Sequence, residues 1–186
     1  MESSLIAAAK GGDASAFETL MGAYERRVYA LCLRMMGNPH DGEDCAQEAM
    51  LRIWQKLPQF RGDSAFSTWV YRVTASCCTD ALRRRRPQPS LDALREDGFD
   101  ARDDAPTPPE AQEAGETQRA IAEALESVPA PMRSVFLLRD VHGLSVEDTA
   151  RALGISGGTV KSRLSRAREK LAQHLRAKGY GPEKGR

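Results

Sequence analysis

Near the C-terminus, two serines and two basic residues have types and spacing suited to contacts with DNA. Ser162 and Ser165 lie opposite an apolar stripe when a helix starting near Gly157 is drawn at about 100° per residue. Lys161 and Arg166 flank them. Small hydroxyls can reach base edges in a major groove, and cations can reach phosphates. The stripe expected to be buried consists of four residues: Val160, Leu164, Ala167 and Leu171.

A shorter helix is expected immediately before this one, from Ser145 to Leu153. Ser145 can cap its first turn, where the acidic side chains of Glu147 and Asp148 also favour a helix start. Gly154 supplies the turn between the two helices. Two short amphipathic helices joined in this way form the helix-turn-helix pattern, which predicts duplex DNA as the ligand.

A second surface suited to nucleic acid is expected on a long helix that Ser64 can cap and that runs to about Arg84. One stripe of this helix offers an aromatic ring, cations and hydroxyls, and it leads into an arginine run at 83–86. Aromatic rings beside arginines suit unpaired bases, because the rings stack while the cations hold the backbone. The alternative is that the aromatic ring belongs to the core and the arginines form a solvated face. The stripe contains Trp69, Arg72, Ser76, Thr79 and Arg83.

The helix expected over residues 41–57 has an outer face of mixed charge with some apolar surface, Met50 and Trp54, beside it. Nothing on this face favours DNA, whereas mixed charge beside an exposed aromatic suits a protein partner. A solvated face held by pairing of residues four apart is an equally open interpretation. The charged and polar positions are Asp44, Gln47, Glu48 and Arg52.

The chain as a whole is predicted to be all-α, with two small helical domains joined by a flexible acidic linker. The first domain covers 1–86 and includes one long helix from Asp13 to Met36, which Gly37-Asn38-Pro39 ends. Residues 87–116 have 2 basic against 9 acidic side chains, five prolines and no apolar period, as is typical of a tether. The second domain covers 117–178, and residues 179–186 are expected to be a disordered tail.

Composition argues against several other classes of protein. The first 20 residues contain no apolar leader segment and no run reaches the length of a membrane span, so a cytoplasmic chain without direct membrane insertion is expected. The three histidines lie near no set with catalytic or metal spacing, so neither an enzyme, a small-molecule substrate, a cofactor nor a metal is expected. The spacings of the four cysteines match no zinc ribbon or CxxC pair, which favours reduced core thiols and leaves a redox switch as the alternative. These cysteines are Cys32, Cys45, Cys77 and Cys78.

Four stretches together resemble the extracytoplasmic-function (ECF) group of bacterial sigma factors. DGEDCAQEAMLRIWQKL is similar to the segment that grips the clamp helices of the RNA polymerase β′ subunit. FRGDSAFSTWVYRVTASCCTDALRRRR is similar to the segment that melts promoters and reads the −10 element. SVPAPMRSVFLLRDVHGLSVEDTARALGISGGTVKSRLSRAREKL is similar to the −35 reader. The acidic segment takes the place of the linker that family members thread towards the polymerase active site.

The resemblance implies roles for individual positions. The core polymerase-binding positions are Asp44, Gln47, Glu48 and Arg52. The −10 DNA-binding positions are Phe60, Arg72, Val73 and Ser76 around a flipped base, with Trp69, Arg83 and Arg84 near the melted strand and the duplex edge. The −35 DNA-binding positions are Thr159, Lys161, Ser162, Arg163, Ser165 and Arg166. Family members usually carry Asn at the place of Ser76, and a single hydroxyl cannot pair bidentately with a base, so the preferred −10 base stays open.

The implied function is promoter-specific transcription initiation with core RNA polymerase, bound through its β′ clamp helices and β flap. An anti-sigma factor is the expected regulator. Two alternatives stay open. A conventional helix-turn-helix regulator would need a ligand or receiver domain, which the first domain does not suggest. A sigma-mimicking protein that binds only an anti-sigma factor should have lost its cations, yet Lys161, Arg166 and the arginine run are present.

Overall fold

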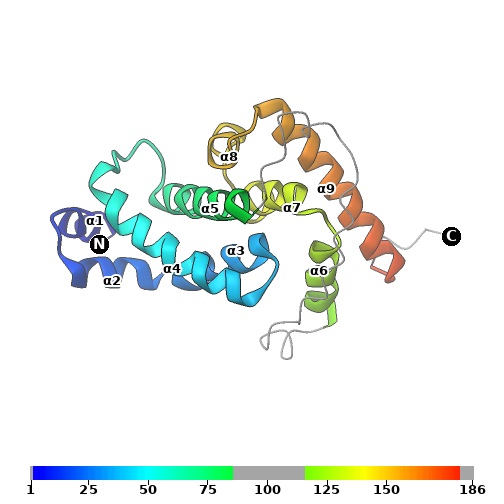
Figure 1. Ribbon diagram of the computed structural model, residues 1–186, viewed down its shortest axis with the longest axis horizontal. Coiled ribbons are helices and arrows are strands. Elements are labelled where there is room, and N and C mark those ends of the chain that lie inside the picture. The colour runs from blue at the N-terminus through cyan, green and yellow to red at the C-terminus, as the bar shows by residue number, and fades with distance from the viewer. Residues whose placement is uncertain (1, 86–115, 181–186) are drawn as a thin grey trace.

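The computed structural model describes residues 2–85 and 116–180, and within these two ranges every regular element is a helix (Figure 1). The predicted all-α class is therefore confirmed. The linker expected at 87–116 lies, except for Glu116, outside the described residues, as do Arg86 and the last six residues of the expected tail. The N-terminal half contains α1 (Glu2–Lys10), α2 (Ala14–Gly22), α3 (Glu25–Met36), α4 (Pro39–Lys56), the 3₁₀ turn η1 (Leu57–Gln59) and α5 (Phe66–Arg85). The C-terminal half contains α6 (Glu116–Glu126), α7 (Ala130–Phe136), the π-helical turn η3 (Leu137–Val141), α8 (Val146–Leu153) and α9 (Gly157–Ala177).

Local chemistry explains where several helices begin and end. The Asp13 carboxylate accepts a hydrogen bond from the backbone N–H of Ala16 at 3.0 Å and caps α2. Gly37 closes α3 in the left-handed region, at φ 83°, and the Asn38 side chain then accepts from the N–H of Asp41 to cap α4. The break predicted between these two helices is confirmed, because glycine adopts the positive φ without steric cost.

The single helix predicted from Asp13 to Met36 was wrong, because the chain breaks between Gly22 and Glu25 and forms α2 and α3. At the break Tyr24 is buried and packs edge-on against the ring of Phe66, with ring centroids 5.5 Å apart. The hydroxyl of Tyr24 donates a hydrogen bond of 2.6 Å to the carboxylate of Glu2 in α1. Tertiary contacts of one residue therefore outweigh the helical pattern of the local sequence.

Helices α3, α4 and α5 pack on one another and hold the core of the N-terminal half. The side chains at its centre are fully buried and come from all three helices: Leu31, Cys32, Ala49, Ile53, Val70 and Cys78. Helices α1 and α2 form a pair that covers one end of this bundle. The bundle fixes the outer faces of α4 and α5, which carry two of the three predicted contact surfaces.

The C-terminal half confirms the predicted helix-turn-helix. Ser145 caps α8 by accepting from the N–H of Asp148 at 2.9 Å, and Gly154 ends it at φ 65°. Ser156 then caps α9 by accepting from the N–H of Thr159 at 3.1 Å. Helices α6, α7 and α8 all contact α9, whose predicted apolar stripe is buried. This stripe consists of Val160, Leu164, Ala167 and Leu171.

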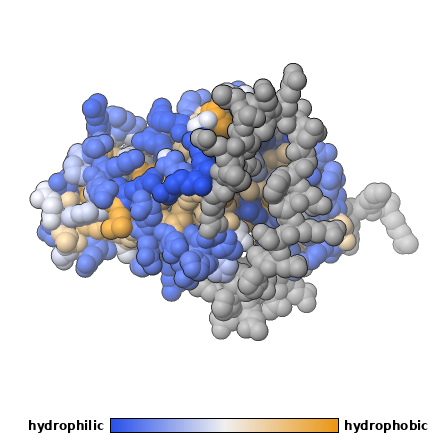
Figure 2. Space-filling view, viewed as in Figure 1, coloured by the Kyte–Doolittle hydropathy of each residue, from blue (hydrophilic) through white to orange (hydrophobic). Residues whose placement is uncertain are grey.

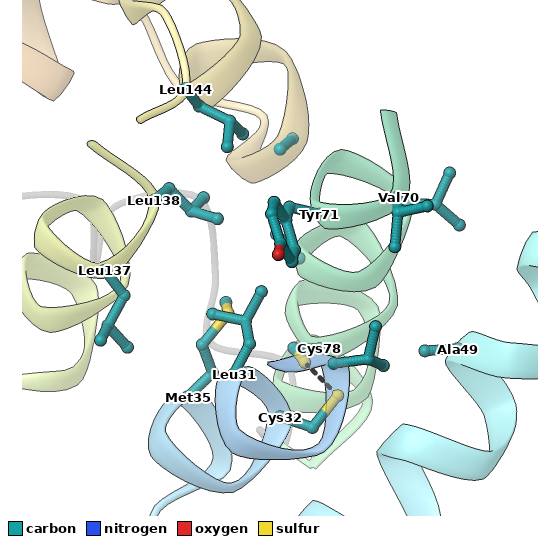
Figure 3. Packing of buried hydrophobic residues seen from close by; sticks show 14 of the residues in the cluster. Leu31, Cys32, Met35, Ala49, Val70, Tyr71, Cys78, Leu137, Leu138 and Leu144 are labelled. Atoms are coloured by element: carbon teal, nitrogen blue, oxygen red, sulfur yellow. Dashed lines mark hydrogen bonds between the residues drawn. The ribbon is translucent and has the colours of Figure 1, made fainter. Parts of the chain in front are cut away.

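The two halves are in direct contact. Helix α5 packs against α8, and α3 contacts α7 (Figure 1). Leu31 and Met35 of α3, with Tyr71 of α5, lie opposite the leucines of the other half, so that one apolar cluster runs through both (Figure 3). These leucines are Leu137, Leu138 and Leu144. In this arrangement the two helical regions share a packed boundary in addition to the covalent connection.

No helix within residues 2–85 or 116–180 combines the length and the apolar character needed to cross a membrane. In the view of Figure 2 the exposed surface is mostly hydrophilic, and its apolar areas are small.

Candidate nucleic-acid and protein interfaces

The outer face of α9 carries the residues predicted to contact duplex DNA. Lys161, Ser162, Ser165 and Arg166 are all exposed, on the side opposite the buried stripe. The hydroxyl of Ser162 donates to a backbone carbonyl of the preceding turn at 3.1 Å, and its oxygen can still accept from a base. Four neighbouring side chains on one helical face therefore offer both hydroxyls and cations to a groove.

Two further positions predicted for the same face are less accessible. Thr159 is half-buried, and its hydroxyl lies 2.9 Å from that of Ser156, within the cap of α9. Arg163 is also half-buried, and burial lowers the pKa of its guanidinium, although arginine stays charged at neutral pH. The structure thus places both residues at the edge of the exposed face and not at its centre.

A bidentate ion pair that the sequence did not suggest holds α9 against the preceding turn. Arg168 donates two hydrogen bonds of 2.7 Å to the carboxylate of Asp140 in η3. This guanidinium lowers the pKa of Asp140, because the ionised form accepts both bonds. In the sequence, Asp140 and Arg168 are recognisable only as opposite charges 28 residues apart, and many other residue pairs share this property.

The aromatic residues predicted for the second DNA surface belong largely to the core. Trp69 is 7% exposed and Phe60 is 9% exposed, and their ring centroids lie 5.3 Å apart. Phe66 packs against both rings, at 5.4 Å from Phe60 and 5.7 Å from Trp69. Val73 is also buried. Only the edges of these side chains reach the surface in this arrangement, as the core interpretation of Trp69 anticipated.

Phe60, Trp69 and Arg72 line a hollow of about 430 Å³ between the loop after η1 and α8. The opposite wall consists of Glu147, Asp148 and Arg151 of α8. The structure thus brings three of the predicted −10 residues to one place. Ser76, which is half-buried one turn further along α5, does not line this hollow.

Helix α8 holds two of the predicted DNA-binding arginines of α5. The guanidinium of Arg72 lies 3.0 Å from the carboxylate of Asp148, and the side chains are 25% and 18% exposed. Arg83 donates to the backbone carbonyl of Leu153 at 3.3 Å and lies against Gly154, where a Cβ atom would come within 2.7 Å of the guanidinium. The Asp148 carboxylate therefore pairs with Arg72, and the C-terminal end of α8 pairs with Arg83. A nucleic-acid backbone would have to replace these partners to contact the two arginines.

The predicted polymerase-binding face of α4 is partly exposed and partly fixed by internal pairs. Asp44 and Gln47 are exposed, whereas Arg52 is tied to Glu48 at 2.8 Å and to Asp80 of α5 at 2.7 Å. These two carboxylates raise the pKa of Arg52, so its role includes joining α4 to α5.

The same face of α4 contains an apolar residue that the sequence analysis missed. Leu51 is 58% exposed, and it lies four residues after Gln47 and seven after Asp44, on their side of the helix. Trp54, in contrast, is half-buried with its ring 4.8 Å from that of Phe17. The spacing of Leu51 relative to the polar positions was the signal that could have identified it.

Comparisons with known proteins match both halves of the chain to one family. Residues 20–88 match the family described as Sigma-70 region 2, and residues 118–171 match the family described as Sigma-70, region 4. The first range includes α3, α4 and α5, and the second includes the helix-turn-helix.

Relatives of known name align with nearly the whole chain. RNA polymerase sigma-H factor of Pseudomonas aeruginosa is 34% identical over 178 residues, covering 92% of each chain. ECF RNA polymerase sigma factor SigW of Bacillus subtilis is 34% identical over 90% of this chain and 92% of its own. ECF RNA polymerase sigma-E factor of Escherichia coli strain K12 is 33% identical over 90% of both.

Two solved structures are also similar. The sigma factor RpoE of Bartonella quintana, in complex with the anti-sigma factor NepR, has a TM-score of 0.64 at 25% identity and covers 86% of this chain and 96% of its own. CnrH, in complex with the cytosolic domain of CnrY, has a TM-score of 0.59 at 27% identity and covers 93% and 96%.

Proposed function

The chain belongs to the ECF group of the sigma-70 family, and we propose that it recruits core RNA polymerase to promoters through three surfaces of its own. The outer face of α4 binds the polymerase, the edge of α5 contacts the melted −10 element, and α9 reads the −35 duplex. The −10 function falls within residues 1–86 and the −35 function within 117–178. No step of this proposal is a chemical reaction of the chain itself.

The observation that carries the proposal is the exposed α9 face on a chain whose other half presents an arginine-bearing edge. Lys161 and Arg166 can neutralise phosphates on either side of Ser162 and Ser165, which can reach base edges. Each good base contact contributes about 1–3 kcal/mol of discrimination, so this small face needs affinity from elsewhere. Polymerase and the −10 surface would supply it.

The −10 surface is proposed to work through the hollow beside Phe60, Trp69 and Arg72. The wall on the side of α5 offers a flipped base the edges of two aromatic rings, those of Phe60 and Trp69. Extruding a base costs a few kcal/mol, which contacts in such a pocket can offset. Ser76 offers one hydroxyl in place of an amide and would bind a base edge less selectively.

Use of this surface requires α8 to move away from α5. The Asp148 carboxylate forms an ion pair with Arg72, and it would repel the phosphates that Arg72 is proposed to bind. Docking of α4 on polymerase is proposed to separate the two halves, with the acidic segment 87–116 lying in a basic channel of the enzyme. A closed free chain and an open polymerase-bound chain follow from this exchange.

An anti-sigma factor is proposed to hold the free chain in the cytoplasm. The structures of RpoE with NepR and of CnrH with CnrY support a partner of this kind for the present chain. Leu51, exposed among polar residues of α4, offers an apolar contact to such a protein as well as to polymerase. The two partners would then compete for one face.

Run-off transcription with purified core polymerase and a library of promoter sequences tests the proposal directly. Core polymerase with the chain should initiate from a subset of promoters sharing −35 and −10 elements, and core polymerase alone should not. A chain lacking the α9 contacts, through Ser162→Ala and Arg166→Ala together, should bind polymerase normally and lose this selectivity. Absence of chain-dependent initiation from every promoter would overturn the proposal.

A further inference from the structure

Three buried thiols from three different helices meet in the core of the N-terminal half. The Cys45 thiol of α4 lies 3.1 Å from the sulfur of Cys78 of α5, and the Cys78 sulfur lies 3.7 Å from that of Cys32 of α3. All three sulfur atoms lie within 4.8 Å of one another (Figure 3 shows the Cys32–Cys78 pair). Cys32 and Cys78 are inaccessible, and Cys45 is almost so.

These separations suit a single metal ion with sulfur ligands. Metal–sulfur bonds of a soft d¹⁰ ion are about 2.3 Å long, so two sulfurs on one ion are at most about 4.6 Å apart. Among the residues that the structure describes, no fourth ligand atom joins the three sulfurs. Soft thiolate ligands select Cu(I), Zn²⁺ or iron–sulfur clusters, and of these Cu(I) is the one suited to three ligands alone. Since the three ligands come from α3, α4 and α5, the helices that define the bundle also fix the geometry of the site.

The fourth cysteine is close by but points elsewhere. The Cys77 thiol is directed at the backbone carbonyl oxygen of Cys45, at 3.9 Å, and it is not part of the group of three sulfurs. Cys77 therefore provides a matched control, because it is buried, lies next to Cys78 in sequence and has the same chemistry.

A hollow at the surface reaches Cys45, one of the three thiol residues. A hollow of about 360 Å³ between α4 and α5 has Cys45 and Cys77 in its wall, together with three carboxylates. The carboxylates belong to Asp41, Asp44 and Glu48, and one cation, Arg84, also lines the hollow. The excess of negative charge attracts a positive ion towards the Cys45 sulfur.

We propose that Cys32, Cys45 and Cys78 bind one Cu(I) ion in a three-coordinate site at the centre of the N-terminal bundle. The ion takes the place of the thiol protons, which leave to solvent as up to three H⁺ per ion bound, and no electron is transferred. Affinity therefore increases with pH.

The bound ion would connect α4, with its outer face, rigidly to α3 and α5. Asp44 and Glu48 line the entry hollow and are also candidate polymerase contacts, so occupancy and polymerase docking would influence each other. This consequence depends on the proposed function, whereas the metal site itself does not. Metal binding and transcription are therefore measured separately.

The test is an anaerobic titration of the reduced full chain with Cu(I), in competition with a coloured Cu(I) chelator. We expect one equivalent bound per chain, a thiolate-to-metal charge-transfer band in the ultraviolet, and three sulfur ligands by X-ray absorption. Cys45→Ser and Cys78→Ala should each weaken binding at least tenfold, since removing one of three ligands leaves an incomplete site. Cys77→Ala should bind as the unchanged chain does, and circular dichroism should show all variants folded.

Several results would overturn the proposal. One is failure of the folded, reduced chain to compete for Cu(I). Another is an equal loss of affinity in Cys77→Ala, which would mean that binding does not depend on the three converging thiols. Preferential uptake of Zn²⁺ with four ligands, or formation of a Cys45–Cys78 disulfide without metal uptake, would also contradict it. If Cys78→Ala does not fold, two measurements still test the proposal. They are the Cu(I) affinity of the isosteric Cys45→Ser and the number of sulfur ligands that X-ray absorption finds in the unchanged chain.

Discussion

Replacing Asp148 with asparagine should loosen the contact between α8 and α5 without unfolding either half. The Asp148 carboxylate pairs with Arg72 at 3.0 Å and also lies 3.5 Å from Arg151. Asparagine keeps the size of the side chain and the backbone N–H that Ser145 caps, but it removes the charge. The substitution keeps the backbone cap of Ser145 but removes both the ion pair and one negative charge from the first turn of α8, and Glu147→Gln controls for that second effect.

The exposure of the two side chains determines the expected magnitude. Exposed pairs contribute about 0.2–1 kcal/mol, and breaking a fully buried pair costs about 3–5 kcal/mol. With side chains 25% and 18% exposed, the Arg72–Asp148 pair lies between these limits, closer to the exposed one, at about 1–2 kcal/mol after allowance for solvent screening. The ratio of closed to open chains should accordingly fall by a factor of about 5–30.

Energy transfer between fluorophores on exposed sites of α2 and α9 measures the closed fraction. Binding of a single-stranded −10 oligonucleotide by the free chain should tighten in Asp148→Asn, because Arg72 is released. Glu147→Gln is the matched control: it removes the same charge from the adjacent, exposed position in the same turn. The ion pair would have no role in closing the molecule if both variants changed the closed fraction equally. The same conclusion would follow if Asp148→Asn left the closed fraction unchanged while the protein stayed folded.

Three further changes have defined outcomes. Arg166→Ala should weaken binding to a −35 duplex about tenfold or more and reduce discrimination between −35 sequences. The affinity for polymerase should stay unchanged in a pull-down titration. An equal loss of affinity for every DNA sequence would mean that Arg166 contacts only phosphate. Leu51→Ser should lower the affinity for core polymerase. Its melting temperature should stay within a few degrees of that of the unchanged chain, because the Leu51 side chain is 58% exposed. An unchanged affinity would mean that Leu51 is not part of the proposed polymerase-binding face. Burial, with Arg34 and Arg27, lowers the pKa of His142 to about 4, so the neutral ring favours the folded chain above about pH 6.5, and this contribution should be lost as pH falls towards 4. Denaturant unfolding across this range should show a weaker pH dependence in His142→Gln, and identical pH profiles of the two chains would contradict this role of His142.

The helix-turn-helix could be predicted because its determinants are local. The caps at Ser145 and Asp13, the turn at Gly154 and the stripe of α9 that includes Leu164 each depend on residues a few positions apart. A 3.6-residue period and a capping side chain act within one or two turns, so the sequence contains the whole physical cause. The exposure of the outer face of α9 could be predicted for the same reason.

The features that escaped prediction all depend on contacts between distant segments. Arg72 and Asp148 are 76 residues apart, and either is indistinguishable in sequence from a solvated charge. For Trp69 the sequence left an exposed ring and a core ring both open, and only the contacts with the rings of Phe60 and Phe66 decide for the core. The three converging cysteines lie on separate helices, so no ligand spacing of the usual kind could reveal them.

The position of Asp148 links the fold of the helix-turn-helix to the availability of the −10 surface. Its backbone N–H belongs to the cap of α8, while its carboxylate faces Arg72, so the capped turn of the proposed −35 reader also supplies the anion that pairs with α5. A DNA phosphate that binds Arg72 would replace the Asp148 carboxylate. Because one anion takes the place of another, the net change in the free energy of ion pairing is small. The apolar contact of Leu138 and Leu144 with α3 and α5 adds to the ion pair in holding the halves together, and a polymerase partner must outweigh both. Binding of melted DNA would in this way depend on polymerase docking, because Arg72 stays paired with Asp148 until the halves separate, whereas the outer face of α9 is already exposed.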